Sequence, residues 1–320
     1  MRKPRWIRTI ALAVVSMFLF AFTACGASGA PAESGGSAAG GAAQSAEKSI
    51  RIGSKGFTEN LIVSELYALA LEEAGYSVER VFDVASSMDH VAITSDEIDV
   101  YPEYTGTGLI VILEHEPVTD PEEVFTIISE EYRERFDLVW LQPAEANDGQ
   151  GIVMRTDVAE QYGIRTLSDL QANAQHIRFA SQGEFEVRED GLPALEAVYG
   201  PFHFASIHVF SNSLKYDVLS NDEADAAPAY TTEGQLSQPE YTLLEDDKQA
   251  WPPYNIAPVM RRDFYEAHPD AVAIIDAVDA TLDTETITGL NARVDVDGQE
   301  YEDVASDYYT GISSEVQAAA

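Results

Sequence analysis

Residues 98–107 combine side chains that suit a small-molecule site with the backbone pattern of a strand end and a helix start. The first four alternate like a buried strand, and Pro102, which has no N–H to donate, is expected to end its ladder. Tyr104 follows, and Thr107 lies at the start of residues 106–113, whose apolar run favours a helix. An aromatic face, unpaired helix N–H groups and a threonine hydroxyl at a strand end are typical of ligand binding in α/β proteins.

The rest of the chain contains little that is typical of catalysis. Its six histidines show no paired spacing for a metal, and the sequence has neither a phosphate-binding P-loop nor a Gly-x-Ser-x-Gly motif. Asp295-Val296-Asp297-Gly298 resembles a calcium loop only in part, because the glycine falls at the wrong position, and we expect a turn there. The sequence therefore indicates no enzyme, cofactor or metal site. A small-molecule binding protein and a surface adhesin are the classes left open.

Net charge limits the partners of the chain. The 320 residues have a formal net charge of −36 and are 45% hydrophobic, as in a globular protein. Residues 1–24 hold four basic residues and no acidic one, which leaves 15 basic against 55 acidic residues in the remainder. Such a surface repels a phosphate backbone, so nucleic acid is not expected as a partner. We interpret the acidity as adaptation to a saline habitat, which predicts that the stability of the fold depends on salt.

The N-terminus has the pattern of a secretion and anchoring signal. Residues 2–8 are basic, residues 10–22 form an apolar stretch too short for a permanent membrane span, and Thr23-Ala24-Cys25-Gly26 resembles a bacterial lipobox. This pattern predicts a lipoprotein signal peptide at 1–24 and a lipid on Cys25, the only cysteine. An ordinary secretory signal is the alternative. Residues 25–49, rich in Gly, Ala and Ser, predict a flexible tether that holds an extracytoplasmic domain to the outer face of the cell membrane.

Strands and helices alternate from residue 50 onward, which predicts an α/β fold whose sheets are mainly parallel and flanked by helices. One series of elements is followed by a second, and the last strand and helices return to the first. This order predicts two lobes, 50–146 with 255–320 and 147–254, around a ligand cleft, as in a type II periplasmic binding protein. The predicted strands are 49–53, 77–81, 98–101, 138–141, 151–154, 177–180, 203–210, 224–230 and 256–260. The predicted helices are 58–75, 86–95, 106–113, 121–136, 167–174, 191–199, 213–220, 261–282 and 301–314.

Six motifs, in order along residues 50–309, carry a resemblance to a known family. They are Ile52-Gly53-Ser54-Lys55-Gly56-Phe57-Thr58-Glu59, residues 98–107, Val139-Trp140-Leu141, Arg188-Glu189-Asp190-Gly191, Ala229-Tyr230-Thr231-Thr232-Glu233-Gly234, and Trp251-Pro252-Pro253-Tyr254 with Ala257-Pro258. In this combination they resemble the osmoprotectant-binding proteins of ABC importers, the glycine betaine/choline/carnitine type. The resemblance covers the whole globular part of the chain.

The resemblance implies a site for a quaternary ammonium ligand, built from both lobes. Matching motif to motif places the aromatic walls of the site at Tyr104, Tyr230 and Tyr254, with Gln150 where the family has a further tyrosine. It places a clamp for a ligand carboxylate at Lys55, Thr107 and Arg188, and Asp148 beside the cationic head group. Two other tyrosines, Tyr101 and Tyr216, are interpreted as core residues.

These residue types suit such a ligand. A trimethylammonium group has no N–H to donate, so aromatic faces bind it through their quadrupole and apolar contact, each contact contributing roughly 0.5–2 kcal/mol. A carboxylate needs donors instead, and an arginine fork, a lysine ammonium and a threonine hydroxyl supply them.

The resemblance therefore implies an importer receptor that delivers an osmoprotectant to a membrane permease driven by an ATPase. Glycine betaine, proline betaine, carnitine and choline stay open as ligands. Choline ranks lower, because it lacks the carboxylate that the clamp would hold. Another methylated or cationic amine, selected by Gln150, is the alternative. A surface adhesin would have no need of the three motif-matched tyrosines.

Overall fold

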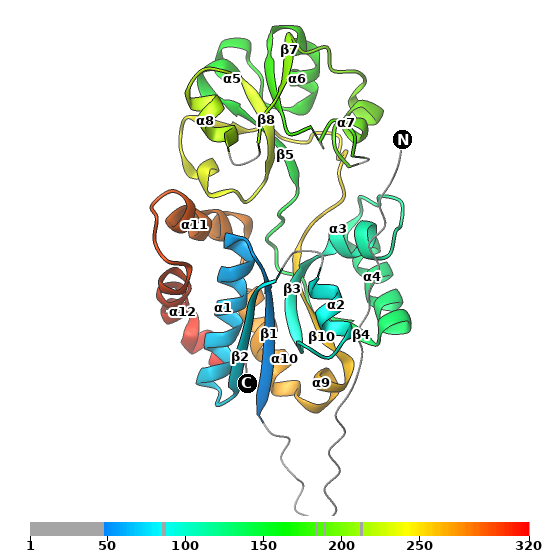
Figure 1. Ribbon diagram of the computed structural model, residues 1–320, viewed down its shortest axis with the longest axis vertical. Coiled ribbons are helices and arrows are strands. Elements are labelled where there is room, and N and C mark those ends of the chain that lie inside the picture. The colour runs from blue at the N-terminus through cyan, green and yellow to red at the C-terminus, as the bar shows by residue number, and fades with distance from the viewer. Residues whose placement is uncertain (1–47, 85–87, 184, 189, 212–213, 320) are drawn as a thin grey trace, which may run out of the picture. The chain divides into compact units, whose positions relative to one another are not determined.

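The computed structural model describes residues 48–84, 88–183, 185–188, 190–211 and 214–319. The predicted signal peptide, most of the predicted tether and Cys25 lie outside the described residues. Two five-stranded sheets with flanking helices make up the described part, as Figure 1 shows. The predicted α/β class is confirmed, and one strand of each sheet runs against the others.

The first sheet has the strand order β2-β1-β3-β10-β4. Strand β1 pairs in parallel with β2 and β3, whereas β10 is antiparallel to both β3 and β4. Strand β10 comes from the far end of the chain, so the sheet is completed only by the returning segment. The bounds are β1 Ser49–Lys55, β2 Ser77–Val84, β3 Val100–Tyr104, β4 Leu138–Trp140 and β10 Ile256–Arg261.

Helices cover both faces of the first sheet (Figure 1). One face packs Ile50 and Ile52 of β1 against apolar residues of α1, α10, α11 and α12. The other face packs Tyr101 and Val259 against α2 and α4. These helices are α1 Thr58–Glu73, α2 Asp89–Thr94, α4 Pro121–Phe136, α10 Pro269–Asp279, α11 Thr284–Asp295 and α12 Tyr301–Gln317, and the short α9 Arg262–Ala267 follows β10.

The second sheet repeats this topology in the order β7-β6-β8-β5-β9. Strand β6 pairs in parallel with β7 and β8, and β5 is antiparallel to β8 and β9. Helices α5, α6 and α7 cover one face, and α8 packs on the other. The bounds are β5 Gln150–Arg155, α5 Thr156–Tyr162, α6 Leu167–Asn173, β6 Arg178–Ser181, α7 Leu192–Tyr199, β7 Ser206–Val209, α8 Lys215–Ser220, β8 Ala226–Tyr230 and β9 Tyr241–Leu243.

The chain passes between the two sheets twice, from β4 to β5 and from β9 to β10. The two crossing segments are tied together, because Asn147 and Asn255 form an isolated antiparallel bridge. The Asn147 side chain accepts the backbone N–H of Tyr254 at 2.7 Å. The predicted lobe boundaries at 146/147 and 254/255 fall within these crossings, and the division into lobes stays a proposal.

The prediction that Pro102 ends its strand is wrong. Strand β3 runs through Pro102, which lies opposite Pro258 in the ladder with β10. The carbonyl of Pro258 accepts the N–H of Leu141, so this position of β10 directs its hydrogen bond away from β3. Neither proline therefore loses a bond between the two strands. On its other side, β3 pairs with β1 only at Val100, before the proline is reached.

Several helices also differ from the prediction. The predicted helix at 106–113 is a short α-helix, α3 Thr105–Thr107, followed by a π-helical turn, Gly108–Ile112. The predicted helix at 261–282 is two helices, because Pro269 cannot continue α9 and instead begins α10. The predictions also miss β9, α5 and α11, and α11 proves to border the candidate site.

Candidate ligand-binding site

Tyr104 ends β3 and is buried, with 4% of its surface exposed. Its hydroxyl donates to Glu59 Oε1 at 2.8 Å, and its ring is stacked with Phe57 at a centroid distance of 6.0 Å. Burial raises the pKa of Tyr104 well above its usual range, and the nearby carboxylates of Glu59 and Asp148 raise it further. The phenol is therefore neutral at physiological pH and is fixed at the edge of the sheet.

Lys55 lies behind this tyrosine rather than in an open cleft. Its ammonium forms a buried ion pair with Glu103 and lies 5.2 Å from the centroid of the Tyr104 ring. Tyr101, predicted to pack in the core, is fully buried and donates to the other oxygen of Glu103 at 3.3 Å. A buried pair of this kind resists the loss of either partner, because a single charge would remain without compensation.

The second sheet repeats this arrangement at the end of β8. Lys215 forms a buried ion pair with Glu233, and its ammonium lies 5.9 Å from the ring centroid of Tyr230. Tyr216 donates to the other oxygen of Glu233 at 2.5 Å. Tyr104 and Tyr230, both predicted as walls of the site, thus end strands of different sheets, and a Lys–Glu pair supports each ring.

A cavity of about 280 Å³ opens beside Tyr230. Gln150 lies directly opposite Tyr230 in the β5–β8 ladder, which places both predicted residues at the same edge of the sheet. Arg188, also predicted, lines the cavity from the segment before α7. The lining residues are Gln150, Gln182, Phe185, Arg188, Gly191, Phe210, Ser211 and Tyr230.

Tyr254 lies in the second crossing segment and connects two parts of the site. Its ring packs on Gly106, at the start of α3, so closely that a Cβ there would lie 2.7 Å from Tyr254 Cδ1. Its hydroxyl donates to Asp190 Oδ2 at 3.4 Å, and Arg188 donates to both oxygens of Asp190 at 2.8 and 2.5 Å. Burial raises the pKa of Tyr254, as does the charge of Asp190, while Arg188 lowers it.

Two buried carboxyl groups, Glu59 and Asp148, lie near enough for the charge of Glu59 to act on Asp148. The Thr232 hydroxyl donates to Asp148 Oδ1 at 2.6 Å. Burial raises the pKa of Glu59, and hydrogen bonds from Thr232, Tyr104 and Asn291 offset part of that rise. Burial raises the pKa of Asp148 well above its usual range, and the charge of Glu59 adds to this effect. The site therefore has an acidic side that a cation would stabilise.

The structure thus groups the predicted residues unevenly. Gln150, Arg188 and Tyr230 share one cavity, and Tyr254 reaches Arg188 through Asp190. Tyr104 and Asp148 are connected through Glu59 and Thr232, and half-buried Thr107 follows Gly106 in α3. The ammonium of Lys55 is bound to Glu103 in this conformation. Sequence reasoning did not single out Phe57, Glu59, Asp190, Thr232 or Asn291, although all but Asn291 lie within or beside the quoted motifs.

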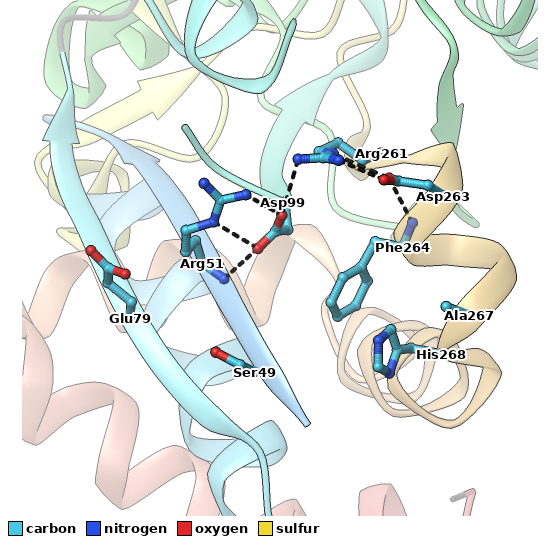
Figure 2. Close-up of a pocket in the computed structure, with 9 residues that line it drawn as sticks. All are labelled: Ser49, Arg51, Glu79, Asp99, Arg261, Asp263, Phe264, Ala267 and His268. Atoms are coloured by element: carbon cyan, nitrogen blue, oxygen red, sulfur yellow. Dashed lines mark hydrogen bonds and ion pairs between the residues drawn. The ribbon is translucent and has the colours of Figure 1, made fainter. Parts of the chain in front are cut away.

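A larger cavity, of about 420 Å³, lies at the opposite end of the first sheet, where β1 begins (Figure 2). Asp99 lies between Arg51 and Arg261 and pairs with both, and Asp263 binds Arg261 as well. Phe264 stacks on His268 with ring centroids 4.2 Å apart. The two arginines of this cavity are neutralised by the carboxylates that line it. The cavity is therefore a weaker candidate for a ligand site than the smaller one beside Tyr230.

Among the residues that the structure describes, no three His, Cys, Asp or Glu side chains are arranged to hold a metal ion. None of the described helices is both long enough and apolar enough to cross a membrane.

Comparison with known proteins places the chain in a family. The substrate-binding domain of ABC-type glycine betaine transport systems matches residues 48–311. The glycine-betaine-binding protein of Pseudomonas aeruginosa is 34% identical over 273 residues, 82% of this chain and 87% of that protein. The ergothioneine transport permease/ergothioneine binding protein EgtU of Helicobacter pylori is 30% identical over 264 residues, 82% of this chain and 47% of that protein.

Solved structures agree on the fold. A glycine betaine/carnitine/choline ABC transporter structure superposes with a TM-score of 0.77 at 24% identity, over 82% of this chain and 98% of that one. The two mixed sheets with flanking helices are the architecture of periplasmic binding proteins. The chain belongs to the family of substrate-binding domains of ABC-type glycine betaine transport systems, and it is a transport protein rather than an enzyme.

Proposed function

We propose that the protein captures a quaternary ammonium compatible solute, glycine betaine or a relative, for an ABC importer. Tyr104, Tyr230 and Tyr254 form the aromatic walls around the cation. When the ligand binds, the two lobes close around it; one lobe is 50–146 with 255–320, and the other is 147–254. A lipid on Cys25 holds the receptor at the outer face of the membrane, where it delivers the ligand to the permease and ATPase subunits.

The observation that supports a cationic ligand most directly is the acidic side of the site beside Tyr104. Glu59 and Asp148 are carboxyl groups whose negative charges disfavour each other in a buried setting. A permanent cation between them and the tyrosine rings relieves that repulsion and gains the attraction of the aromatic faces. Because a quaternary ammonium cannot release a proton, its charge is present at every pH.

Arg188 is the main candidate for the carboxylate of a betaine. It faces the cavity beside Tyr230, and its partner Asp190 holds the fork in place. Thr107, in α3, supplies a hydroxyl next to the turn that Tyr254 covers. Lys55 joins this clamp only when its ion pair with Glu103 opens. Otherwise it supports the Tyr104 ring from behind, as Lys215 supports Tyr230.

A second ligand class is favoured by the amide groups in the cavity. Gln150 and Gln182 both line it, where a purely aromatic wall would be apolar. A betaine that carries a polar ring, such as ergothioneine, could form hydrogen bonds with amides that glycine betaine cannot reach. Carnitine, which has a hydroxyl group, and choline are smaller quaternary ammonium alternatives without a ring.

Calorimetry of the purified protein tests the proposal. The titrants are glycine betaine, proline betaine, carnitine, choline and ergothioneine, with glycine as an amino acid that lacks the methyl groups. We expect at least one betaine to bind at micromolar concentration and glycine not to bind. If none of the quaternary ammonium compounds binds at millimolar concentration, the proposed function is wrong.

A further inference from the structure

Asn291 is a buried side chain on α11, a helix of the first sheet's side of the molecule. Its Nδ2 donates to Glu59 Oε2 at 3.1 Å and to the backbone carbonyl of Thr232 at 2.8 Å. Glu59 belongs to α1, whereas Thr232 follows β8 of the second sheet. The Asn291 amide nitrogen thus connects a helix that packs on the first sheet to the segment that follows β8 of the second sheet.

Each of these two partners holds a residue of the candidate site. Glu59 accepts the Tyr104 hydroxyl at 2.8 Å, and the Thr232 hydroxyl donates to Asp148 at 2.6 Å. A continuous series of hydrogen bonds therefore runs from Tyr104 through Glu59 and Asn291 to Thr232 and Asp148. The residues at its two ends are an aromatic wall and the carboxylate proposed to lie beside the cation.

The orientation of the Asn291 amide follows from its partners. Both are acceptors, so rotating the amide by half a turn would direct its oxygen at a carboxylate and a carbonyl. In this orientation Asn291 Oδ1 is buried and has no hydrogen-bond partner. A side chain needed only to fill the core would not require this arrangement, because an apolar residue would fill the same space without leaving a polar atom unpaired.

A close backbone contact brings Asn291 within hydrogen-bonding distance of Thr232. Gly234 opens a 3₁₀ turn, Gly234–Ser237, directly against the backbone of α11. A Cβ at Gly234 would lie 2.6 Å from the nitrogen of Ala292 and 2.7 Å from the carbonyl carbon of Asn291. The absence of a side chain at Gly234 therefore sets the separation between α11 and the Thr232 segment.

We propose that Asn291 is a positioning residue that holds Tyr104 and Asp148 in register across the two sides of the molecule. Its importance for affinity rests on the proposed quaternary ammonium function, whereas the mechanical coupling does not. Asn291 touches neither the cation nor the carboxylate of the ligand in this proposal. It acts through Glu59 and Thr232.

The charged groups around Glu59 give this role a pH signature. Asp148 is its acidic neighbour, Glu233 adds a second negative charge near Asp148, and the Lys55 ammonium lies 5.2 Å from the centroid of the Tyr104 ring. The hydrogen bond from Asn291 lowers the pKa of Glu59. Removing it raises that pKa, so a ligand that prefers the ionised carboxylate should lose affinity at a higher pH in the variant than in the wild type.

The test uses the full-length protein with Asn291→Ala and, independently, Gly234→Ala, which should push α11 away by steric contact. The matched controls are Gly289→Ala, on the same helix with nothing within 4 Å of the added Cβ, and Asn173→Ala on α6, which loses only a bond to Asp169. Backbone hydrogen exchange of the ligand-free proteins is followed at 103–107, at 231–238 and along α11, and ligand affinity is measured by calorimetry from pH 5 to pH 8.

We expect faster exchange in both segments for Asn291→Ala and Gly234→Ala, and for neither control. We also expect about tenfold weaker binding of glycine betaine, with the acid limb of the affinity profile moved upward in pH for Asn291→Ala. Faster exchange confined to α11, or an affinity equal to that of the wild type, would overturn the inference. If wild-type protein binds no quaternary ammonium compound, the proposed function fails, and exchange at the two segments still decides whether Asn291 couples them.

Discussion

The ring of Tyr254 rests on the backbone of Gly106, with room for a hydrogen atom but not for a methyl group: an added Cβ would lie 2.7 Å from both Cδ1 and Cε1. The same Cβ would approach the carbonyl oxygen of Pro253 to 2.9 Å. The aromatic wall on the crossing segment and the start of α3 are therefore positioned by direct contact, so neither can shift without the other.

Gly106→Ala should displace Tyr254 from the site. The extra methyl group overpacks a closed contact, which costs about 1–3 kcal/mol, and we expect the affinity for glycine betaine to fall roughly tenfold. Calorimetry measures the loss of affinity, and thermal unfolding measures the loss of stability. Gly311→Ala on α12, with nothing within 4 Å, is the control that should leave affinity unchanged. Wild-type affinity for Gly106→Ala would show that Tyr254 does not contact the ligand.

Tyr254→Ala should weaken ligand binding far more than Tyr216→Ala. Tyr254 is proposed as a wall of the site, whereas Tyr216 hydrogen-bonds Glu233 and packs on Tyr241 with ring centroids 4.9 Å apart. The loss of one cation–π wall should cost about 1–2 kcal/mol, or roughly tenfold in affinity. Equal losses for the two variants, measured by calorimetry on folded protein, would refute this choice of aromatic residues.

Arg188→Gln should distinguish ligands that carry a carboxylate from one that does not. The guanidinium is partly exposed, so solvent screens its charge, and we expect about a fivefold to tenfold loss for glycine betaine. Choline, which has a hydroxyl in place of the carboxylate, should bind the variant and the wild type almost equally. If both ligands weaken in parallel, Arg188 supports the fold of the site and does not hold an anion.

Gln150→Tyr should tighten glycine betaine if the aromatic wall at this position is missing. Gln150 lies opposite Tyr230 in the β5–β8 ladder, so a tyrosine there would stand beside an existing wall. One added cation–π contact predicts roughly tenfold higher affinity. The same change should weaken any ligand that hydrogen-bonds the amide. An unchanged affinity for every titrant would remove Gln150 from the site.

Binding of the cation should release protons. Glu59 and Asp148 have pKa values raised by burial in the free protein, and a nearby positive charge lowers both. Affinity should therefore rise with pH between the lowered values of the complex and the raised values of the free protein. In the ligand-free protein, the same two groups make the stability of the fold change with pH in the opposite direction to the affinity. At these two groups the folded state binds more protons than the unfolded chain, so their contribution to stability falls as pH rises from about 4 through the raised values.

Calorimetry in two buffers of different ionisation enthalpy measures the released protons. Glu59→Gln removes one of the two acidic groups and keeps an acceptor for the Tyr104 hydroxyl, so it should release fewer. A proton count of zero in the wild type would mean that both carboxyl groups have the same charge with and without ligand.

Local patterns in the sequence predicted the change from strand to helix near Tyr104, but not the residue at which the strand ends. Tyr104 is the last residue of β3, and Thr107 lies in α3, which follows the strand directly. Pro102 was misjudged because the effect of a proline depends on which neighbour its missing N–H would face. That direction is set by the pairing with β10, which lies far away in the sequence.

The spacing of residues along the sequence could not predict ion-pair partners or tertiary contacts. Nothing near Lys55 in the sequence shows that Glu103, 48 positions later, pairs with it in the core. The helix that carries Asn291 has a glycine and several threonines in its sequence, which are poor helix formers. Its packing on the 3₁₀ turn at Gly234 overrides that local preference, so the residue that connects the two sides of the site stayed hidden.

The position of β10 between β3 and β4 also has a consequence for how the protein folds. The contact between Asn255 and Thr105 joins residues 150 positions apart, and every residue of the second sheet lies between them. During synthesis the second sheet is complete before β10 leaves the ribosome, so it can fold while the first still has a gap at its centre. Closing that gap is a slow, non-local step, and it brings Tyr254 onto Gly106. Ligand-binding competence should therefore be the last property that a newly made chain acquires.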